Sequence, residues 1–457
     1  MSPAIVSAWS PRDLGAHLDL VTIQLDDDER RALDGDEGPV WQKLMLTMAL
    51  YAQAMGADRL VNLDAPGHLV ISEPVPGVGA RLEFLEELVS AGISGRMPFS
   101  VNPPAPALAD IGDLSVSQSQ TFGGRAPIIR RYTDLLLELG LRPHGAATCM
   151  PWLEEVGNKP ACGQVIAWAE SSAVVYANSV LGARTHRNPG LIDLVSNLTG
   201  RTPAAGLVTD EGRRATVSVD VSTRQPPDPQ LLGYVLGRAV LGEVPILNNL
   251  GTYFELERPA IRCRLLHDIG TNAAVGGAVG LFHVRHVTPD ALRSGDAVLA
   301  PGYRSLLIGD ADLEAAEAEL RAGVEFVHDS PPARAVLGCP HLSLEQIEQW
   351  TRRIDGALSA AGRGSLAVPT TIVTAPGVLA ALRARGDIIE RLGSWGVEVR
   401  CYCLEALMQD SVVAPPVVIT NSNKLRYYNR GVMRFSDDAL LRIIISGRLE
   451  QPSDRAP

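Results

Sequence analysis

The last third of the chain alternates short apolar segments with amphipathic ones, and this alternation constrains the fold more than any other feature. Four segments have the length and composition of buried strands, at residues 335–338, 367–373, 396–401 and 417–420. The first is followed by Ser343 and Gln346, spaced as a capping box that begins a helix. Strands that alternate with helices predict a doubly wound, mostly parallel sheet.

Thiol and hydroxyl side chains follow three of these four strands. Cys339 comes directly after the first strand, Cys403 lies just beyond the third, and Ser422 follows the fourth. In doubly wound sheets, ligands bind outside the carboxyl ends of the strands. The pattern therefore predicts that these three residues lie along one edge of the sheet, where a site can form.

The remainder of the chain also predicts α/β structure. Helical periodicity at residues 39–55 and 82–91 is followed in each case by a short strand-like segment, at residues 59–62 and 97–101. A chain of 457 residues is long enough for two or three domains. We expect three α/β domains, at residues 1–140, 141–300 and 301–457.

Composition and charge exclude several classes of function. The net charge of −11 argues against nucleic acid and acidic membranes as partners, and no apolar stretch reaches the ~18 residues that span a bilayer. Residues 1–13 lack the basic start and apolar run of a signal peptide, so a cytoplasmic location is expected. In that compartment the six cysteines are expected to be thiols, ligands or catalysts rather than disulfides.

Familiar motifs for other chemistries are missing from the sequence. It contains no GxxxxGK[ST] phosphate loop, no HExxH, no GxSxG and no GxGxxG. Nucleotide hydrolysis, zinc proteolysis, serine hydrolysis and simple dinucleotide binding therefore lose support.

Three scattered cysteines, Cys149, Cys339 and Cys403, are candidate metal ligands. Three thiolates can hold an iron–sulfur cluster and leave one iron with an open position. Such an iron is a Lewis acid that can bind a hydroxyl group and make it a better leaving group. Their spacing alone favours the alternative that they are buried structural thiols.

The distinctive segments are ATCMPW around Cys149, LGCPHLS around Cys339, RCYCLEA around Cys403, residues 166–187 and TNSNK at residues 420–424. Together they resemble the large, catalytic subunit of the aconitase X family, which belongs to the aconitase superfamily of hydro-lyases. The resemblance runs from about residue 25 to the last helix. It implies several doubly wound α/β domains of aconitase-like type around a central cleft.

The resemblance also implies an iron–sulfur cofactor. Cys149, Cys339 and Cys403 fall on the family's three cysteine positions. The family has an aspartate two residues before the third cysteine, where this chain has Cys401. It therefore stays open whether Cys401 or Cys403 is the third ligand.

Further site residues are implied by the same resemblance. The catalytic residues would be Ser422, Lys424, His341 and Glu170. The substrate-binding residues would be Ser171, Ser172, Asn178, Arg184, Arg187, His68 and Asn102. The alternatives are structural: a capped helix with solvated arginines at 170–187, a helix N-cap at Ser422, and histidines that serve packing.

The implied activity is dehydration of a small hydroxy acid by an iron–sulfur lyase. Family members dehydrate cis-3-hydroxy-L-proline or mevalonate 5-phosphate, and we expect the first substrate here. An aconitase-like isomerase and a non-catalytic metal-binding scaffold remain as alternatives. The family also has a small swivelling domain that supplies a serine for proton transfer. No segment of this chain resembles that domain, so a separate small subunit is the expected partner.

Overall fold

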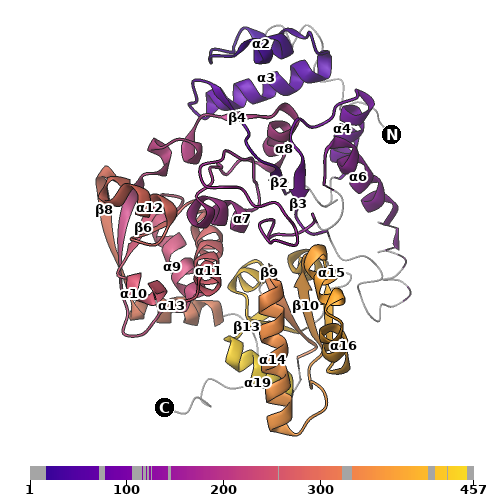
Figure 1. Cartoon of the computed structure of the whole chain (residues 1–457), viewed down its shortest axis with the longest axis vertical. Coiled ribbons are helices and arrows are strands. Elements are labelled where there is room, and N and C mark those ends of the chain that lie inside the picture. The colour runs from indigo at the N-terminus through magenta and orange to yellow at the C-terminus, as the bar shows by residue number, and fades with distance from the viewer. Residues whose placement is uncertain are drawn as a thin grey trace.

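The computed structural model describes residues 17–70, 78–104, 116, 120, 123–124, 126–142, 146–255, 257–321, 332–409, 417–429 and 431–449. Within these residues the chain is mixed α/β, with two parallel sheets of five and four strands and two pairs of short strands. In Figure 1 the helices of the N-terminal part lie at the top and right, the four-stranded sheet at the left and the C-terminal part below. None of the described helices is both long enough and apolar enough to cross a bilayer.

The C-terminal sheet confirms the predicted doubly wound architecture. Its strands are β9 (Arg334–Leu342), β10 (Thr370–Thr374), β11 (Val397–Arg400), β12 (Val418–Thr420) and β13 (Val432–Arg434). They are all parallel, in the order β11-β10-β9-β12-β13. The chain builds outward from β9 in one direction and then from β12 in the other. The point where the direction reverses, between β9 and β12, is where such sheets form ligand sites.

Helices cover this sheet and follow the predicted pattern. They are α14 (Leu344–Ala361), α15 (Pro376–Ala384), α16 (Asp387–Ser394), α17 (Leu404–Gln409), α18 (Asn423–Tyr428) and α19 (Asp437–Ser446). The capping box at the start of α14 is confirmed: Ser343 accepts from the Gln346 amide, and the Gln346 side chain accepts from the Ser343 amide. Trp350 of α14 packs with Ile372 and Ile419 of the sheet in the core.

The four-stranded sheet has the order β7-β6-β5-β8 and is also parallel. Its strands are β5 (Ala215–Ser222), β6 (Pro245–Asn248), β7 (His283–Val284) and β8 (Leu299–Gly309). Beside it lie α9 (Pro229–Val240), α10 (Gly251–Glu255), α11 (Pro259–Gly277), α12 (Pro289–Ser294) and α13 (Asp310–Arg321). Helices α9 and α11 approach each other closely enough for their backbones to touch. A Cβ at Gly277 would lie 1.7 Å from the Gly237 carbonyl oxygen, so only glycine fits at that position.

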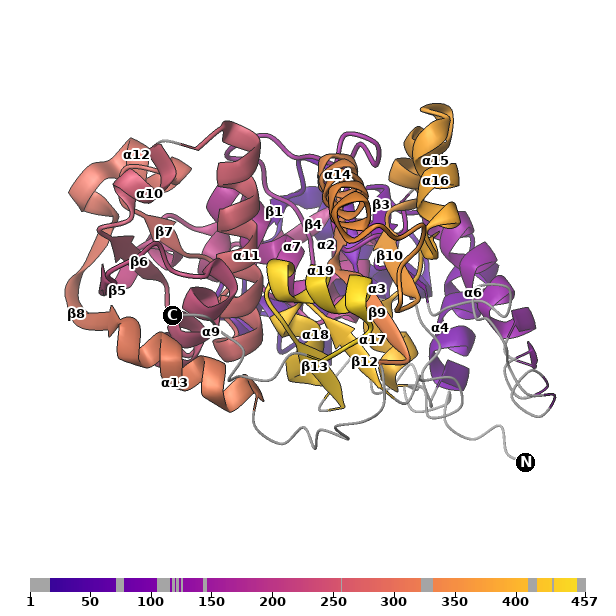
Figure 2. The ribbon, with the colours of Figure 1, turned by 90° about the horizontal axis from the view of Figure 1, so that it is seen from below.

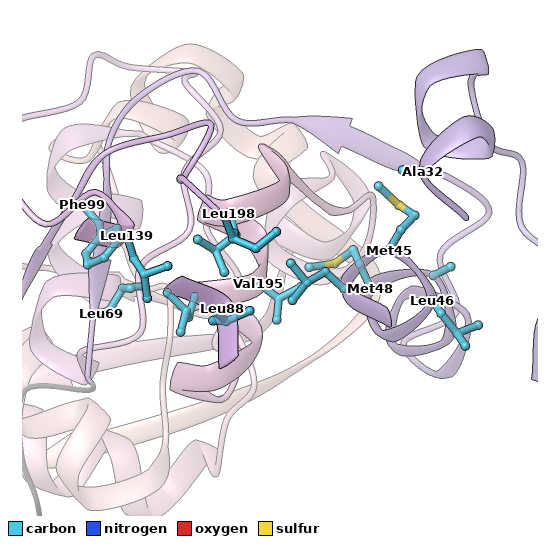
Figure 3. Close-up of a cluster of buried hydrophobic side chains, with 14 of the residues drawn as sticks. Ala32, Met45, Leu46, Met48, Leu69, Leu88, Phe99, Leu139, Val195 and Leu198 are labelled. Carbon is cyan, nitrogen blue, oxygen red and sulfur yellow. The ribbon is translucent and has the colours of Figure 1, made fainter. Parts of the chain in front are cut away.

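The N-terminal part packs helices around two pairs of short strands. Its helices are α2 (Asp27–Asp34), α3 (Pro39–Ala54), α4 (Val78–Ser90), α6 (Ala126–Leu139) and α8 (Gly190–Thr199). Strands β1 (Leu60–Asn62) and β4 (Arg201–Pro203) are antiparallel, and β2 (Gly67–Leu69) and β3 (Phe99–Val101) are parallel. Figure 3 shows Val195 and Leu198 of α8 between side chains of α3 and those of β3 and α6. The helices and strands predicted here are confirmed within a few residues at each end.

Candidate active site

Strand β9 leaves regular pairing at the point where it reaches the switch point of the sheet. Leu337 pairs with Ile372, and the next pair is Leu342 with Thr374, so residues 338–341 protrude from the sheet. Gly338 makes this possible, because it has a φ of 113° and a Cβ there would lie 2.4 Å from a backbone oxygen of β10. The peptide bond between Cys339 and Pro340 is cis. The expectation that the strand ends before Cys339 was therefore wrong: β9 continues to Leu342 around an irregular bulge that carries Cys339.

A cavity of about 410 Å³ lies against this bulge. Three of the predicted thiols line it: Cys149 from an N-terminal loop, Cys339 from the bulge, and Cys403 from the turn before α17. Cys401, just beyond the end of β11, is not among the described residues that line the cavity. The fold therefore brings thiols from three remote segments to one cavity, and of the pair at 401 and 403 it is Cys403 that lines it.

The three thiols lie in a buried environment. Burial, with the Glu170 carboxylate, raises the pKa of Cys149 to about 12 against the opposing charge of Lys424. Burial raises the pKa of Cys339 well above its usual range. The Cys149 sulfur accepts a hydrogen bond of 3.1 Å from the His341 amide, which fixes it beside the bulge. All six cysteines are described, and none forms a disulfide. In the described part of the chain, no three His, Cys, Asp or Glu side chains converge as ligands of a single metal ion.

A buried ion pair forms the polar side of the cavity. Glu170 caps α7 (Ser171–Tyr176) and Lys424 lies in the first turn of α18; both line the cavity, with Nζ 2.7 Å from Oε1. Glu170 also accepts hydrogen bonds of 2.6 Å from the Ser172 hydroxyl and the Ala173 amide. Burial would raise the pKa of Glu170, but Lys424 and these donors lower it to about 2. Burial opposes the charge of Lys424, yet Glu170 and the cysteines hold its pKa well above its usual range.

Ser422 has a structural place beside the cavity. Its hydroxyl caps α18 by accepting from the Leu425 amide at 3.1 Å, and it donates to the backbone oxygen of Cys339. Ser422 is buried and is not among the described lining residues. Its geometry corresponds to the N-cap alternative, and it ties the start of α18 to the bulge.

Both predicted histidines are buried and held by the protein. His341 lines the cavity; its Nε2 donates to the Tyr402 carbonyl oxygen, so its Nδ1 accepts from the Thr148 hydroxyl at 3.0 Å. His68 contacts the Ser100 hydroxyl through Nδ1 and the Asn102 amide oxygen through Nε2. Burial lowers the pKa of each histidine to about 4, so both rings are neutral at pH 7.

Of the residues predicted to bind substrate, Ser171 and Asn102 line the cavity. Ser172 is buried beneath it and donates to Glu170. His68 supports Asn102 from behind, through the contact to its amide oxygen. These four residues therefore belong to the cavity wall or to its immediate support.

The second half of the 166–187 segment turns away from the cavity. Asn178 lies in a π-helical turn, η2 (Ala177–Leu181), and its amide bonds the backbone of Thr185 and Gly280 and the guanidinium of Arg213. Arg184 donates to the Val208 oxygen and to Asp210, and Arg187 donates to the Ala278 oxygen. None of Asn178, Arg184 and Arg187 is among the described lining residues. Their hydrogen bonds connect the 166–187 segment to residues that precede β5 and β7 of the four-stranded sheet.

The lining residues that sequence reasoning missed include Tyr428, Glu405 and Gly190. Tyr428 is four residues after Lys424, so both project from one face of α18, and this spacing is visible in the sequence. Glu405 is two residues after Cys403. Gly190 begins α8, whose N-terminus has no side-chain cap.

Comparison with known proteins assigns the family. Residues 22–211 match the first domain of aconitase X, and residues 333–437 match its third domain. The phosphomevalonate dehydratase large subunit of Methanothermobacter thermautotrophicus is 32% identical over 383 residues, which are 83% of this chain and 88% of that protein. The corresponding large subunit of Thermococcus kodakarensis is 29% identical over 89% of this chain and 95% of its own length.

Two further similarities agree with this assignment. The cis-3-hydroxy-L-proline dehydratase of Pseudomonas aeruginosa is 29% identical over 436 residues, which are 90% of this chain and 67% of that protein. The crystal structure of Thermococcus kodakaraensis aconitase X in its holo-form superimposes with a TM-score of 0.76 at 27% identity, covering 93% of this chain and all of that one. This chain belongs to the aconitase X family.

Proposed function

We propose that this chain is the large subunit of an iron–sulfur dehydratase that removes water from a small hydroxy amino acid, with cis-3-hydroxy-L-proline as the substrate. Its relatives are named as dehydratases, and the chain is a lyase. The observation that carries the proposal is the cavity in which Cys149, Cys339 and Cys403 face the Glu170–Lys424 pair.

The thiol arrangement fits a cluster better than a single ion. In a polynuclear cluster each cysteine can bind a different iron, so the sulfurs need not converge on one point. Among the described residues, no three such side chains converge on a single metal ion. We assign the three lining cysteines as ligands, with Cys401 excluded by its position. When bound, such a cluster supplies an open iron as a Lewis acid for the departing hydroxyl group.

The charges around the cavity favour a zwitterionic substrate. Among the described lining residues, Lys424 is the one side chain that is permanently cationic, and it is paired with Glu170; Glu405 adds a second carboxylate. No arginine is among those lining residues. Phosphate groups are normally held by arginine or lysine clusters. An amino acid carries one ammonium and one carboxylate, so Lys424 can hold its carboxylate while Glu405 faces its ammonium.

Mevalonate 5-phosphate is the second candidate substrate, and one observation favours it. Gly190 lines the cavity at the N-terminus of α8, where no side chain caps the helix. Helix N-termini are suited to binding phosphate. Two of the relatives named above are phosphomevalonate dehydratase large subunits, and this chain covers 88% and 95% of their lengths.

The chain's own residues are better suited to holding the substrate than to removing its proton. A carboxylate whose pKa is about 2 is a weak base, so Glu170 serves to fix Lys424. His341 uses both ring nitrogens in bonds to the protein. The other lining groups that can accept a proton are Glu405 and Tyr428. Because relatives are named large subunits, we assign proton abstraction to a residue of a separate small subunit that covers the cavity.

The test is anaerobic purification of the chain with its small partner, followed by iron and sulfide assays and product analysis. Dehydration of cis-3-hydroxy-L-proline is expected, without turnover of mevalonate 5-phosphate. The reverse selectivity would replace the first substrate by the second. A rehydrated isomer would indicate an isomerase. A colourless protein that contains zinc and no iron would contradict the cluster and support a scaffold role.

A further inference from the structure

A second cavity lies among α11, α14, the end of α15 and the loop that follows Cys149. Its volume is about 730 Å³, and none of its described lining residues also lines the cavity of the three thiols. Figure 2 shows α14 between α11 and α15. Small-molecule sites typically have volumes of about 300–1,000 Å³, so the second cavity has room for a small organic ligand.

Three segments line the second cavity shortly after they pass the thiols and the ion pair. Trp152 lines it three residues after Cys149. Tyr176 lines it from the end of α7, the helix that Glu170 caps. The first turn of α14 also lines it, and this turn follows the bulge of β9. A ligand in the second cavity therefore contacts segments that carry candidate site residues.

Aromatic rings form the floor of the second cavity. Trp152 stacks on Tyr176 with ring centroids 4.0 Å apart, and the His267 ring meets the two rings edge-on, at 5.0 and 5.5 Å. All three residues line the cavity and are buried. Burial lowers the pKa of His267 to about 4, so the floor carries no charge at pH 7. Such a floor suits an apolar or aromatic group.

Charged side chains of both signs line the second cavity, and half of them are left without a partner. Arg385 pairs with Glu348, and Arg258 lies 3.9 Å from Glu345. The other charged lining residues form no side-chain hydrogen bond or ion pair in the part of the chain that the structure describes. They are Arg264, Arg352, Glu154 and Glu155. Two cationic and two anionic groups are thus available to a ligand.

We propose that the second cavity binds a free α-amino acid with an apolar or aromatic side chain, and that this ligand steadies the loop that carries Cys149. Arg264 and Arg352 bind the carboxylate, because guanidinium groups offer paired donors that match its two oxygens. Glu154 or Glu155 binds the ammonium, and the side chain packs on the aromatic floor. A ligand with only one of these charges would leave the side chains of the other sign unpaired.

Trp152 carries the effect of the ligand to the candidate active site. The ligand packs against this ring, which is three residues from Cys149, and so favours one position of the loop. If that position also holds the cluster, ligand and cluster stabilise each other's binding, because coupling between two sites is reciprocal. This second step rests on the proposed role of Cys149 as a cluster ligand. The binding step does not.

The first test measures binding by isothermal titration calorimetry of the full chain under anaerobic conditions, with and without iron, using L-phenylalanine as the probe. Phenylacetate lacks the ammonium and phenethylamine lacks the carboxylate, so each should bind at least about tenfold more weakly. Arg352→Ser should raise the dissociation constant of L-phenylalanine about tenfold. Arg383→Ser is the matched control, at an exposed position of α15 that does not line the second cavity, and should bind normally.

Arg352 is chosen for this test over Arg264 because the charge of Arg264 also acts on Asp268, whose pKa burial raises to about 7. Replacement of Arg264 would therefore disturb a second buried group. Arg352 is exposed on α14, so its replacement should leave the fold intact. Circular dichroism of both variants checks this.

The second test measures coupling as the rate at which a chelator removes iron from the reconstituted chain, followed by visible absorption. Saturating L-phenylalanine should slow this rate about fivefold or more in the wild-type chain and in Arg383→Ser. At the same concentration it should have much less effect in Arg352→Ser. Because this readout is separate from dehydration, it does not depend on the identity of the substrate.

The two tests fail in different ways. A full chain that does not bind L-phenylalanine, or binds it equally well as Arg352→Ser, would overturn the second site. Normal binding without any change in the rate of iron loss would overturn the coupling. A chain that takes up no iron would contradict the proposed cofactor, and the calorimetry of the iron-free chain would then decide the second site by itself.

Discussion

Lys424 and Glu170 are 254 positions apart in the sequence and form a buried ion pair, with 2.7 Å between Nζ and Oε1. The pair joins α18 of the C-terminal sheet to the start of α7, and it forms one wall of the cavity that the thiols line. Because both groups are desolvated, each depends on the other for its charge. The contact therefore sets the relative position of two segments that carry site residues.

Removal of one partner should harm stability more than removal of both. Lys424→Met leaves the Glu170 carboxylate buried without a counter-charge, which we expect to cost about 3–5 kcal/mol in the free energy of unfolding. The double variant Glu170→Gln/Lys424→Met should recover most of that loss and remain inactive, because the substrate carboxylate has lost its cation. Urea denaturation and dehydratase assays measure the two effects. Equal stability of the single and double variants would show that the pair is not coupled.

The two cysteines near the end of β11 should differ in their effect on iron. Cys403 lines the cavity and Cys401 does not, so Cys403→Ser should lose iron and visible absorption after anaerobic reconstitution. Cys401→Ser is the matched control, two residues away, and should retain wild-type iron content. Circular dichroism checks that both variants fold. If Cys401→Ser loses the iron while Cys403→Ser keeps it, our ligand assignment is wrong.

The fold of the C-terminal part could be predicted because its signals are local. Each strand is a short apolar segment, and a capping box begins α14. The alternation of strands and helices can therefore be recognised without knowledge of distant contacts. Cys339, Cys403 and Ser422 were expected at one edge of the sheet. The structure places the two thiols on one cavity and bonds Ser422 to the backbone of Cys339.

The rest depends on contacts between remote segments, which no local pattern reports. Asn178 lies within a segment rich in polar groups, but its amide oxygen accepts a hydrogen bond from Arg213, which is 35 positions away. This contact holds the amide outside the cavity. The bulge in β9 was missed because Gly338 resembles an ordinary end of a strand, and only its pairing with β10 shows otherwise. No local pattern indicated the ion pair of Glu170 either. A glutamate just before a helix has the same sequence context whether it caps the helix, acts as a catalytic acid or pairs with a remote lysine.

Gly338 should be the least replaceable glycine near the site. Gly338→Ala places a Cβ 2.4 Å from the Val373 carbonyl oxygen at a φ of 113°, so the bulge must shift and carry Cys339 with it. We expect loss of iron binding and a loss of about 2 kcal/mol or more in stability. Gly356→Ala in α14, where nothing lies within 4 Å, should instead stabilise by about 0.5–1 kcal/mol. Normal iron content in Gly338→Ala would show that the bulge tolerates displacement.

Asp193 in α8 should make stability depend on pH. It is fully buried; Oδ1 accepts from Asn188, and Oδ2 has no hydrogen-bond partner among the described residues. Burial raises the pKa of this carboxyl from 3.8 to about 7, against the hydrogen bond from Asn188. The folded state therefore holds the proton more tightly than the unfolded state. Its stabilising effect is fully present below pH 3.8 and is lost as the pH rises towards about 7.

The variant Asp193→Asn cannot ionise and should escape this loss. Its free energy of unfolding, minus that of the wild type, should rise by up to about 1.4 kcal/mol per pH unit between pH 4 and 7 and then level off. The difference is the quantity to measure, because burial also raises the pKa of Asp268 to about 7 and gives both chains a common slope. Asp36→Asn, at an exposed position, is the control and should track the wild type. A constant difference across this range would mean that Asp193 is already ionised in the folded chain at pH 4.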